Sequence, residues 1–292
     1  MINSDDMSRF VFITDLHITD KSNVRTGDIL ADICDKLEYV VDYANQTDSI
    51  ILIGGDVFDH PSVPDYVKVR VAAIFRKAKN TIYAIAGNHD ILYNNEEFNH
   101  RTSYNLFVEF GVFKNLIIED FCDVVISSIL PVKNFGKPQI IMYHGFYNVE
   151  DGKCTCKTSD VITTTDECVV LLGHDHSVYP VENPRNNVRV YREGSFLRGI
   201  RTDEQNRIPN MVCLSVENDK INVELVPIKC RAASEIFEAK SFSFTPSQTH
   251  KSYEDIISKI KDAHNSDLTL ESALKQVTTQ DVVDYIEMLV NE

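Results

Sequence analysis

The stretch Ile50-Ile51-Leu52-Ile53-Gly54-Gly55-Asp56-Val57-Phe58-Asp59 decides the fold. An apolar, β-rich run that ends at two glycines is typical of a buried strand. The carboxylate of Asp56 follows at once, so it should lie at the C-terminal edge of that strand. In an open α/β sheet, ligands bind at this edge. Because a single Gly-Gly-Asp is more often an ordinary turn, the prediction depends on whether other strands end in the same way.

Two neighbouring strands do end in the same way. The first runs into Asp15-Leu16-His17 and the third into Gly87-Asn88-His89-Asp90. Apolar residues at helical spacing separate the strands, so parallel pairing with helices packed on the sheet is expected. The predicted strands are 9–14, 50–53 and 81–86, and the predicted helices are 28–46 and 64–79.

The second half of the chain, up to about residue 227, is rich in short strands. Two of them also end on histidine: residues 139–143 lead to His144-Gly145, and residues 168–172 lead to Gly173-His174-Asp175-His176. We therefore expect two facing sheets with helices outside. Amphipathic helical spacing follows after Lys229, which predicts a catalytic domain at 1–228 and a small C-terminal cap or partner-binding region at 229–292.

Composition limits the function classes. The chain has 292 residues, 43% of them hydrophobic, and a formal net charge of −15. This charge argues against coating of nucleic acid by bulk electrostatics but leaves a nuclease open, since bound metal ions can offset the field locally. No apolar run is long enough to span a membrane and the first residues lack a signal peptide, so a cytoplasmic protein is expected.

The seven cysteines are an odd number and lie mostly inside apolar runs, so a disulfide framework is not expected. Cys154 and Cys156 form one close pair, but no second pair would complete a tetrahedral zinc site. Surface thiols are the favoured interpretation of that pair.

Taken together, the strand ends carry a ligand set for two divalent ions. Carboxylate, imidazole and amide oxygen suit Mn²⁺, Fe²⁺ or Zn²⁺, and Asp56 could bridge two ions about 3.5–4 Å apart, which suits phosphoryl transfer. Each motif alone is usually an ordinary polar turn, but five of them after five apolar runs favour a two-metal site. The residues are Asp15, His17, Asp56, Asn88, His89, His144, His174 and His176.

In this order, the five motifs resemble the full set of the calcineurin-like metallophosphoesterase superfamily, over about residues 9–227. The resemblance implies an α/β fold, a four-layer αββα sandwich. It assigns one ion to Asp15, His17, Asp56 and His176, and the other to Asp56, Asn88, His144 and His174. It also implies that His89 stabilises the transition state or protonates the leaving oxygen, with Asp90 orienting its ring. Mn²⁺ is the expected metal.

The branch of the superfamily is indicated by residues around the second motif. Phosphoprotein phosphatases carry an arginine after Asp59 and a glutamate at position 90, whereas this chain has His60-Pro61 and Asp90. Gly55 to Asp59 followed by Pro61 and Pro64 resembles instead the DNA-repair nuclease branch, the SbcD-like subunits and above all their bacteriophage relatives. The loop from Gly194 to Arg201 resembles the phage version.

That loop also concentrates arginine in an acidic chain. Arginine suits phosphate oxygens, so Ser195, Arg198 and Arg201 are predicted substrate contacts. Surface ion pairs with the nearby acids are an equally weighted alternative. The arginines are Arg185, Arg189, Arg192, Arg198, Arg201 and Arg207, and the acids are Glu182, Glu193, Asp203 and Glu204.

The sequence thus predicts a two-metal phosphodiesterase acting on DNA, the nuclease subunit of an SbcCD-type repair or phage recombination complex. By resemblance, the C-terminal helices would dock on the coiled coil of an SbcC-like ATPase subunit, although they could equally fold back on their own domain, and a homodimer is also allowed. A small-molecule or cyclic-nucleotide phosphodiesterase would keep the same metal site. A non-catalytic scaffold would normally have lost ligands, and this sequence keeps all of them.

Overall fold

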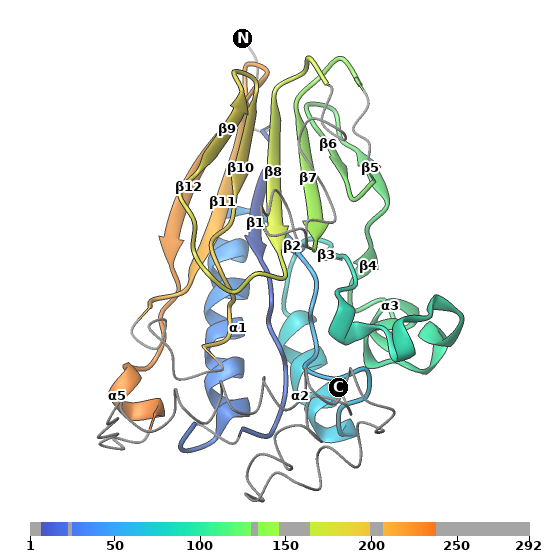
Figure 1. Cartoon of the computed structure of the whole chain (residues 1–292), viewed down its shortest axis with the longest axis vertical. Helices are drawn as coiled ribbons and strands as arrows, with labels where there is room; N and C mark the ends of the chain where they lie inside the picture. Colours follow the sequence, from blue (N-terminus) through green and yellow to red (C-terminus); the bar gives the residue numbers. More distant parts are fainter. Residues whose placement is uncertain (1–6, 23–24, 130–133, 146–163, 199–206, 238–292) are drawn as a thin grey trace, which may run out of the picture. The chain divides into compact units, whose positions relative to one another are not determined.

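The computed structural model describes residues 7–22, 25–129, 134–145, 164–198 and 207–237. Within them the chain forms two six-stranded mixed sheets, with helices packed on one of the sheets (Figure 1). The predicted α/β sandwich of two facing sheets is therefore confirmed.

The first sheet has the strand order β12-β11-β1-β2-β3-β4. β1 to β4 are parallel, and the β11–β12 hairpin adds antiparallel to β1. Phe10 of β1 pairs with Ile50 of β2 and Ile13 pairs with Ile53, so both strands end at the same edge. The strands are β1 (Arg9–Ile13), β2 (Ile50–Ile53), β3 (Tyr83–Ala84), β4 (Lys114–Asn115), β11 (Asn210–Glu217) and β12 (Lys220–Pro227).

The second sheet has the order β5-β6-β7-β8-β10-β9. Its four central strands, β6, β7, β8 and β10, are parallel, and the two edge strands are antiparallel to their neighbours. The strands are β5 (Ile118–Asp120), β6 (Val125–Ser127), β7 (Gln139–His144), β8 (Cys168–Gly173), β9 (Glu182–Arg185) and β10 (Val188–Tyr191). β9 is mostly exposed and lacks an apolar pattern, so the sequence did not predict it.

Helices follow the predicted pattern with shorter ends. α1 begins after Asp28, whose side chain accepts a hydrogen bond from the backbone N–H of Ala31 and so caps the helix. α2 stops four residues before the predicted end at Lys79. The helices are α1 (Ile29–Thr47), α2 (Asp65–Phe75), α3 (Ser103–Glu109) and α5 (Ala233–Ile236), with 3₁₀ turns η1 (Asn88–Asp90), η2 (Leu92–Asn94) and η3 (Glu96–Arg101).

The alternation of side chains along β1 divides the core into two layers. Phe10 and Phe12 pack between the sheets with Ile140 and Met142 of β7. Val11 and Ile13 point the other way, against the apolar faces of α1 and α2. A strand buried on both faces explains why the sequence of β1 is apolar throughout.

The predicted C-terminal region is only partly described. β12 ends at Pro227 and the chain reaches α5, whereas residues 238–292, which hold most of the predicted helices, lie outside the described residues. The boundary at 228 stays a prediction. The described cysteines are all free, and the pair Cys154 and Cys156 lies outside the described residues. Among the described helices, none is long and apolar enough to cross a membrane.

Candidate metal centre

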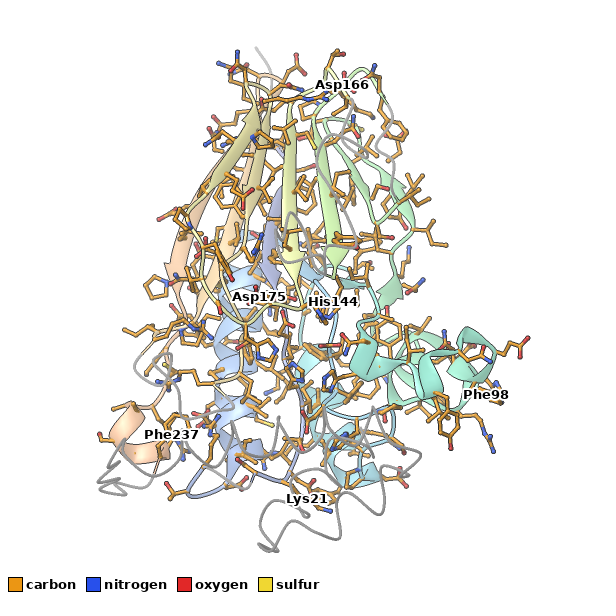
Figure 2. The ribbon with its side chains drawn as sticks, viewed as in Figure 1. Lys21, Phe98, His144, Asp166, Asp175 and Phe237 are labelled. Atoms are coloured by element: carbon orange, nitrogen blue, oxygen red, sulfur yellow. The ribbon has the colours of Figure 1, made fainter. Side chains whose placement is uncertain are left out.

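The strand ends bring the predicted ligands together at one edge of both sheets. His144 and Asp175 lie at this level, next to the ends of β7 and β8 (Figure 2). Three groups of described side chains have their possible ligand atoms within 4.8 Å of one another, and two of these groups consist of predicted ligands alone. One group is Asp15, His17 and His176, and the other is Asp56, His144 and His174.

Asp56 connects the two groups. Its Oδ2 lies 3.2 Å from Nε2 of His144 in one group and 3.7 Å from Nε2 of His17 in the other. A single carboxylate oxygen thus faces both groups, which is the arrangement of a bridging ligand between two ions. Asp56 is 2% exposed, so this carboxylate has little contact with water.

The histidine tautomers favour metal binding. Nδ1 of His144 lies 2.8 Å from the carbonyl oxygen of Gly54, which can only accept, so Nδ1 carries a hydrogen, and Nε2, once it has lost its own proton, offers a lone pair to an ion. That Nε2 is buried and makes no aligned hydrogen bond, although Asp56 is close. His17 is held similarly, with Nδ1 3.3 Å from Oδ1 of Asp59 and Nε2 facing the site. A buried lone pair beside a carboxylate fits a bound cation.

The remaining distances also fit metal ions. The Nε2 atoms of His17 and His176 are 3.0 Å apart, and Nδ1 of His174 is 2.8 Å from Oδ1 of Asn88. Ligands about 2.0–2.2 Å from a common ion lie about 3 Å from each other, so these separations match neighbours in one coordination shell. The ligand roles themselves stay predictions.

The backbone is strained where the ligands sit. Among the described residues, eight other than glycine have positive φ, and four of these are predicted ligands. Such conformations cost on the order of 1–3 kcal/mol each and collect at functional sites, where the surrounding structure holds them. The four are Asp15, His17, Asp56 and His174.

Close packing explains two of the glycines. Gly55 has φ +100, and a Cβ there would lie 2.6 Å from Cγ of His144. Gly87 has ordinary dihedral angles, but a Cβ there would lie 2.7 Å from Cγ of Asp56 and closer still to its Oδ1. A larger residue at either position would therefore displace a predicted ligand.

Charges of opposite sign stabilise one another in this centre. Burial raises the pKa of Asp56, but the hydrogen bond and positive charge of His144 outweigh burial and hold the pKa well below its usual range. The pKa of Asp15 is lowered too, because His176 and His144 outweigh its burial. Burial would lower the pKa of His144, yet the two carboxylates raise it to about 9. The carboxylates are thus anions that attract a cation.

The prediction that Asp90 orients the ring of His89 is wrong. The carboxylate of Asp90 accepts backbone N–H groups from Gly87, Val57 and Phe58, at 2.9–3.0 Å. Its burial raises its pKa to about 6 against those hydrogen bonds. Nδ1 of His89 lies instead 2.7 Å from the backbone carbonyl oxygen of Asp59. Asp90 therefore braces the loop that carries Asp56.

Two of the predicted substrate contacts, Ser195 and Arg198, are buried and bond to the protein itself. Ser195 is 1% exposed, and its hydroxyl donates to the carbonyl oxygen of Leu197 at 2.5 Å. Arg198 is 4% exposed and donates to the carbonyl oxygen of Arg231 at 2.5 Å. Both side chains are committed to the protein's own backbone. Arg201, the third predicted contact, lies outside the described residues.

The alternative interpretation of the arginines holds in part. Arg192 lies 3.5 Å from Glu182 and 3.8 Å from Asp175, with its guanidinium over the ring of Tyr179. Arg189 pairs with Glu167 at 2.6 Å. These arginines join strands of the second sheet.

Asp59, which has no predicted role, lies behind His17 and His89. Its carboxylate lies 3.3 Å from Nδ1 of His17, and its carbonyl oxygen faces His89. Metal-binding histidines usually donate their second N–H to such an acceptor. The signal was the second carboxylate in Asp56-Val57-Phe58-Asp59, three residues after the bridging one.

Comparison with known proteins gives a family match. The family model described as calcineurin-like phosphoesterase matches residues 8–195. No curated protein matches the chain.

Solved structures also resemble this chain. The 5'-nucleotidase precursor from Thermus thermophilus has 12% identity and a TM-score of 0.45, over 76% of this chain and 54% of that one. This chain thus spans about half of that protein. Vacuolar Protein Sorting 29 from Cryptosporidium parvum has 15% identity and a TM-score of 0.36, over 77% and 100%. TT1561 of Thermus thermophilus has 10% identity and a TM-score of 0.42, over 75% and 99%.

Proposed function

The chain belongs to the calcineurin-like phosphoesterase family, and from that premise we propose that it is a two-metal phosphodiesterase that cleaves DNA. It would be the nuclease subunit of an SbcCD-type complex, encoded by a bacteriophage and paired with an SbcC-like coiled-coil ATPase. The observation that carries the phosphodiesterase is the position of Asp56 between two groups of ligands.

The residues present can hold the metals that this chemistry needs. Asp15, His17 and His176 would bind one ion, and Asn88, His144 and His174 the other, with Asp56 shared. When bound, two divalent ions would polarise the phosphate and lower the pKa of a water molecule.

His89 supports the proton-transfer part of the proposal. Its Nδ1 faces a carbonyl oxygen, which can only accept, so Nδ1 keeps its hydrogen and Nε2 is the atom that exchanges a proton. The ring lies edge to face against the ring of His17, with centroids 4.7 Å apart. A histidine so fixed beside a predicted ligand suits a general acid for the leaving oxygen.

DNA as the substrate rests on the resemblance at the second motif. Asp59 is followed by His60-Pro61 where phosphatases carry a phosphate-binding arginine. The partner-binding role of residues 229–292 rests on the resemblance as well.

A second candidate is a small-molecule or cyclic-nucleotide phosphodiesterase. The observation that favours it is the commitment of Arg189, Arg192 and Arg198 to internal contacts, in a chain of net charge −15. Without those arginines, the described residues provide less positive charge for a long polyanion than the sequence suggested.

The test is Mn²⁺-dependent cleavage of end-labelled single- and double-stranded DNA beside bis-p-nitrophenyl phosphate. His89→Ala should keep its metal and lose turnover, whereas Asp56→Ala should lose both. His100→Ala is the matched control, because His100 is exposed and its ring nitrogen contacts the backbone carbonyl of Glu97, away from the predicted ligands. DNA cleavage that persists in His89→Ala would remove its role. Hydrolysis of the small diester without DNA cleavage would favour the second candidate.

A further inference from the structure

A cavity of about 550 Å³ opens directly beside the candidate metal centre. One wall is formed by three residues of the centre, His17, His89 and His176. The volume lies within the range of about 300–1,000 Å³ typical of pockets that bury small ligands. A phosphate bound at the metal centre would therefore present one of its ester groups to this cavity.

Part of the cavity lining is apolar. Ile29 at the start of α1, Val63 before α2 and Leu197 after β10 line it, and all three are at least nine-tenths buried. Their backbones are fixed: the N–H of Leu197 donates to the carbonyl oxygen of Asp15, and the N–H of Val63 donates to the hydroxyl of Ser103. A preformed apolar wall suits a planar ring and offers nothing to a charged group.

The cavity also has a cationic side. Lys21 lines it on an exposed loop, and its ammonium group forms no ion pair within the described part of the chain. The two carboxylates of the lining are engaged, Asp20 by the hydroxyl of Tyr66 and Asp59 by His17. Figure 2 shows Lys21 well below the level of His144, toward the end of the molecule that holds α1 and α2.

We propose that this cavity binds the nucleoside esterified to the scissile phosphate, with the base against Ile29, Val63 and Leu197 and the next phosphate against Lys21. This inference rests on the proposed function and names its substrate as a nucleotide ester. An apolar wall next to a phosphate site, with a cation beyond it, matches the alternation of base and phosphate in a strand.

Two substrates with the same leaving group test the inference in the full-length chain. Thymidine 5'-p-nitrophenyl phosphate and methyl p-nitrophenyl phosphate differ only in the group offered to the cavity. The expected ratio of their kcat/KM values, with Mn²⁺, is about tenfold or more in favour of the nucleoside ester, the size of one base contact. A ratio near one would overturn the proposal.

Ser62→Trp tests the location, because Ser62 is exposed, lines the cavity and is no predicted ligand, so a large ring there obstructs the cavity. The ratio should fall at least fivefold, and an unchanged ratio would overturn the proposal. Lys21→Ala should weaken binding of thymidine 3',5'-bisphosphate at least threefold more than binding of thymidine 5'-monophosphate. Lys220→Ala, at an exposed turn between β11 and β12, should change neither.

Calorimetric binding of thymidine 5'-monophosphate separates this inference from the proposed function. Affinity that falls in Ser62→Trp, in a protein that hydrolyses neither ester, would support the cavity and refute the phosphodiesterase. Hydrolysis of both esters at equal rates, with no nucleotide affinity that depends on Ser62, would do the reverse.

Discussion

Gly87→Ala is the substitution with which the packing of the metal centre can be tested most directly. Gly87 has φ −99, a conformation that alanine adopts freely, so the backbone is not strained by the change. The new Cβ would instead lie 2.7 Å from Cγ of Asp56 and closer to its Oδ1, below the 3.0 Å that real Cβ atoms keep. Something must move, and the nearest group is the predicted bridging ligand.

The size of the effect follows from that displacement. Oδ1 of Asp56 has to retreat by about 1 Å, and it accepts the N–H of His89 at 2.9 Å, so His89 moves or loses this hydrogen bond. A misplacement of about 1 Å in a catalytic group costs roughly 100-fold in rate. We therefore expect kcat/KM for bis-p-nitrophenyl phosphate to fall about 100-fold and one of two Mn²⁺ ions to bind at least tenfold more weakly.

The assay combines hydrolysis of the diester with calorimetric titration of Mn²⁺. Gly136→Ala is the control: it puts an alanine at φ +75 with no atom within 4 Å of the new Cβ, so it strains the backbone away from the centre. Circular dichroism would show that both variants fold. If Gly87→Ala binds two Mn²⁺ ions normally and keeps its activity within threefold, the inferred position of Asp56 is wrong.

Four other predictions follow from contacts around the centre. Lys36 is fully buried and donates to the carbonyl oxygen of Phe196 at 3.0 Å. Lys36→Ala should therefore reduce the free energy of unfolding by about 3–5 kcal/mol, and Lys36→Met, which fills the space, should reduce it by less. Equal losses of the two variants in urea unfolding would contradict this. Burial lowers the pKa of Lys36 to about 8, against 10.5 in the unfolded chain. Between these two pH values the unfolded chain binds more protons than the folded protein, so the free energy of unfolding should rise with pH. Measured relative to Lys36→Met, it should rise across that window instead of staying flat. Mn²⁺ at 100 times its dissociation constant should stabilise the protein by about 2.7 kcal/mol per site in thermal unfolding, and Asp56→Ala should lose that gain; stabilisation that survives in Asp56→Ala would place the metal elsewhere. Asp59→Ala should weaken Mn²⁺ binding about 10–100-fold, because Nδ1 of His17 loses its acceptor. The control Asp35→Ala removes a surface partner of Arg231 and should leave Mn²⁺ binding unchanged. Equal Mn²⁺ affinities in the two variants would contradict the role of Asp59.

The convergence of the predicted ligands could be foreseen from sequence, because each of them lies next to its own structural signal. Asp15, Asp56 and His144 follow apolar runs directly, and the ends of parallel strands meet at one edge whatever the loops between them do. Nothing beyond local pattern and strand direction is needed to bring them together. The same holds for α1, whose apolar spacing and Asp28 cap are both local.

The side-chain partners could not be predicted, because sequence adjacency does not set the direction of a side chain. Asp90 follows His89, yet the 3₁₀ turn from Asn88 to Asp90 turns its carboxylate toward the backbone of Val57 and Phe58. Arg198 lies in an arginine-rich loop, but its partner is the carbonyl oxygen of Arg231, 33 residues further along the chain. Charge and position in the sequence alone therefore do not distinguish a buried arginine from a surface one.

The described part of the Gly-Ser loop after β10, residues 194–198, supports the predicted ligands. The N–H groups of Phe196 and Leu197 donate to the carbonyl oxygens of Thr14 and Asp15, at 2.9 and 3.3 Å, and Lys36 holds Phe196 from the other side. At Gly194, with φ +73, a Cβ would crowd the backbone of His176. Any enzyme with this metal centre needs such support, whether it cleaves DNA or a small diester. Substrate choice must therefore be read from cavity residues that neither bind nor support the predicted ligands, such as Ile29, Val63 and Lys21.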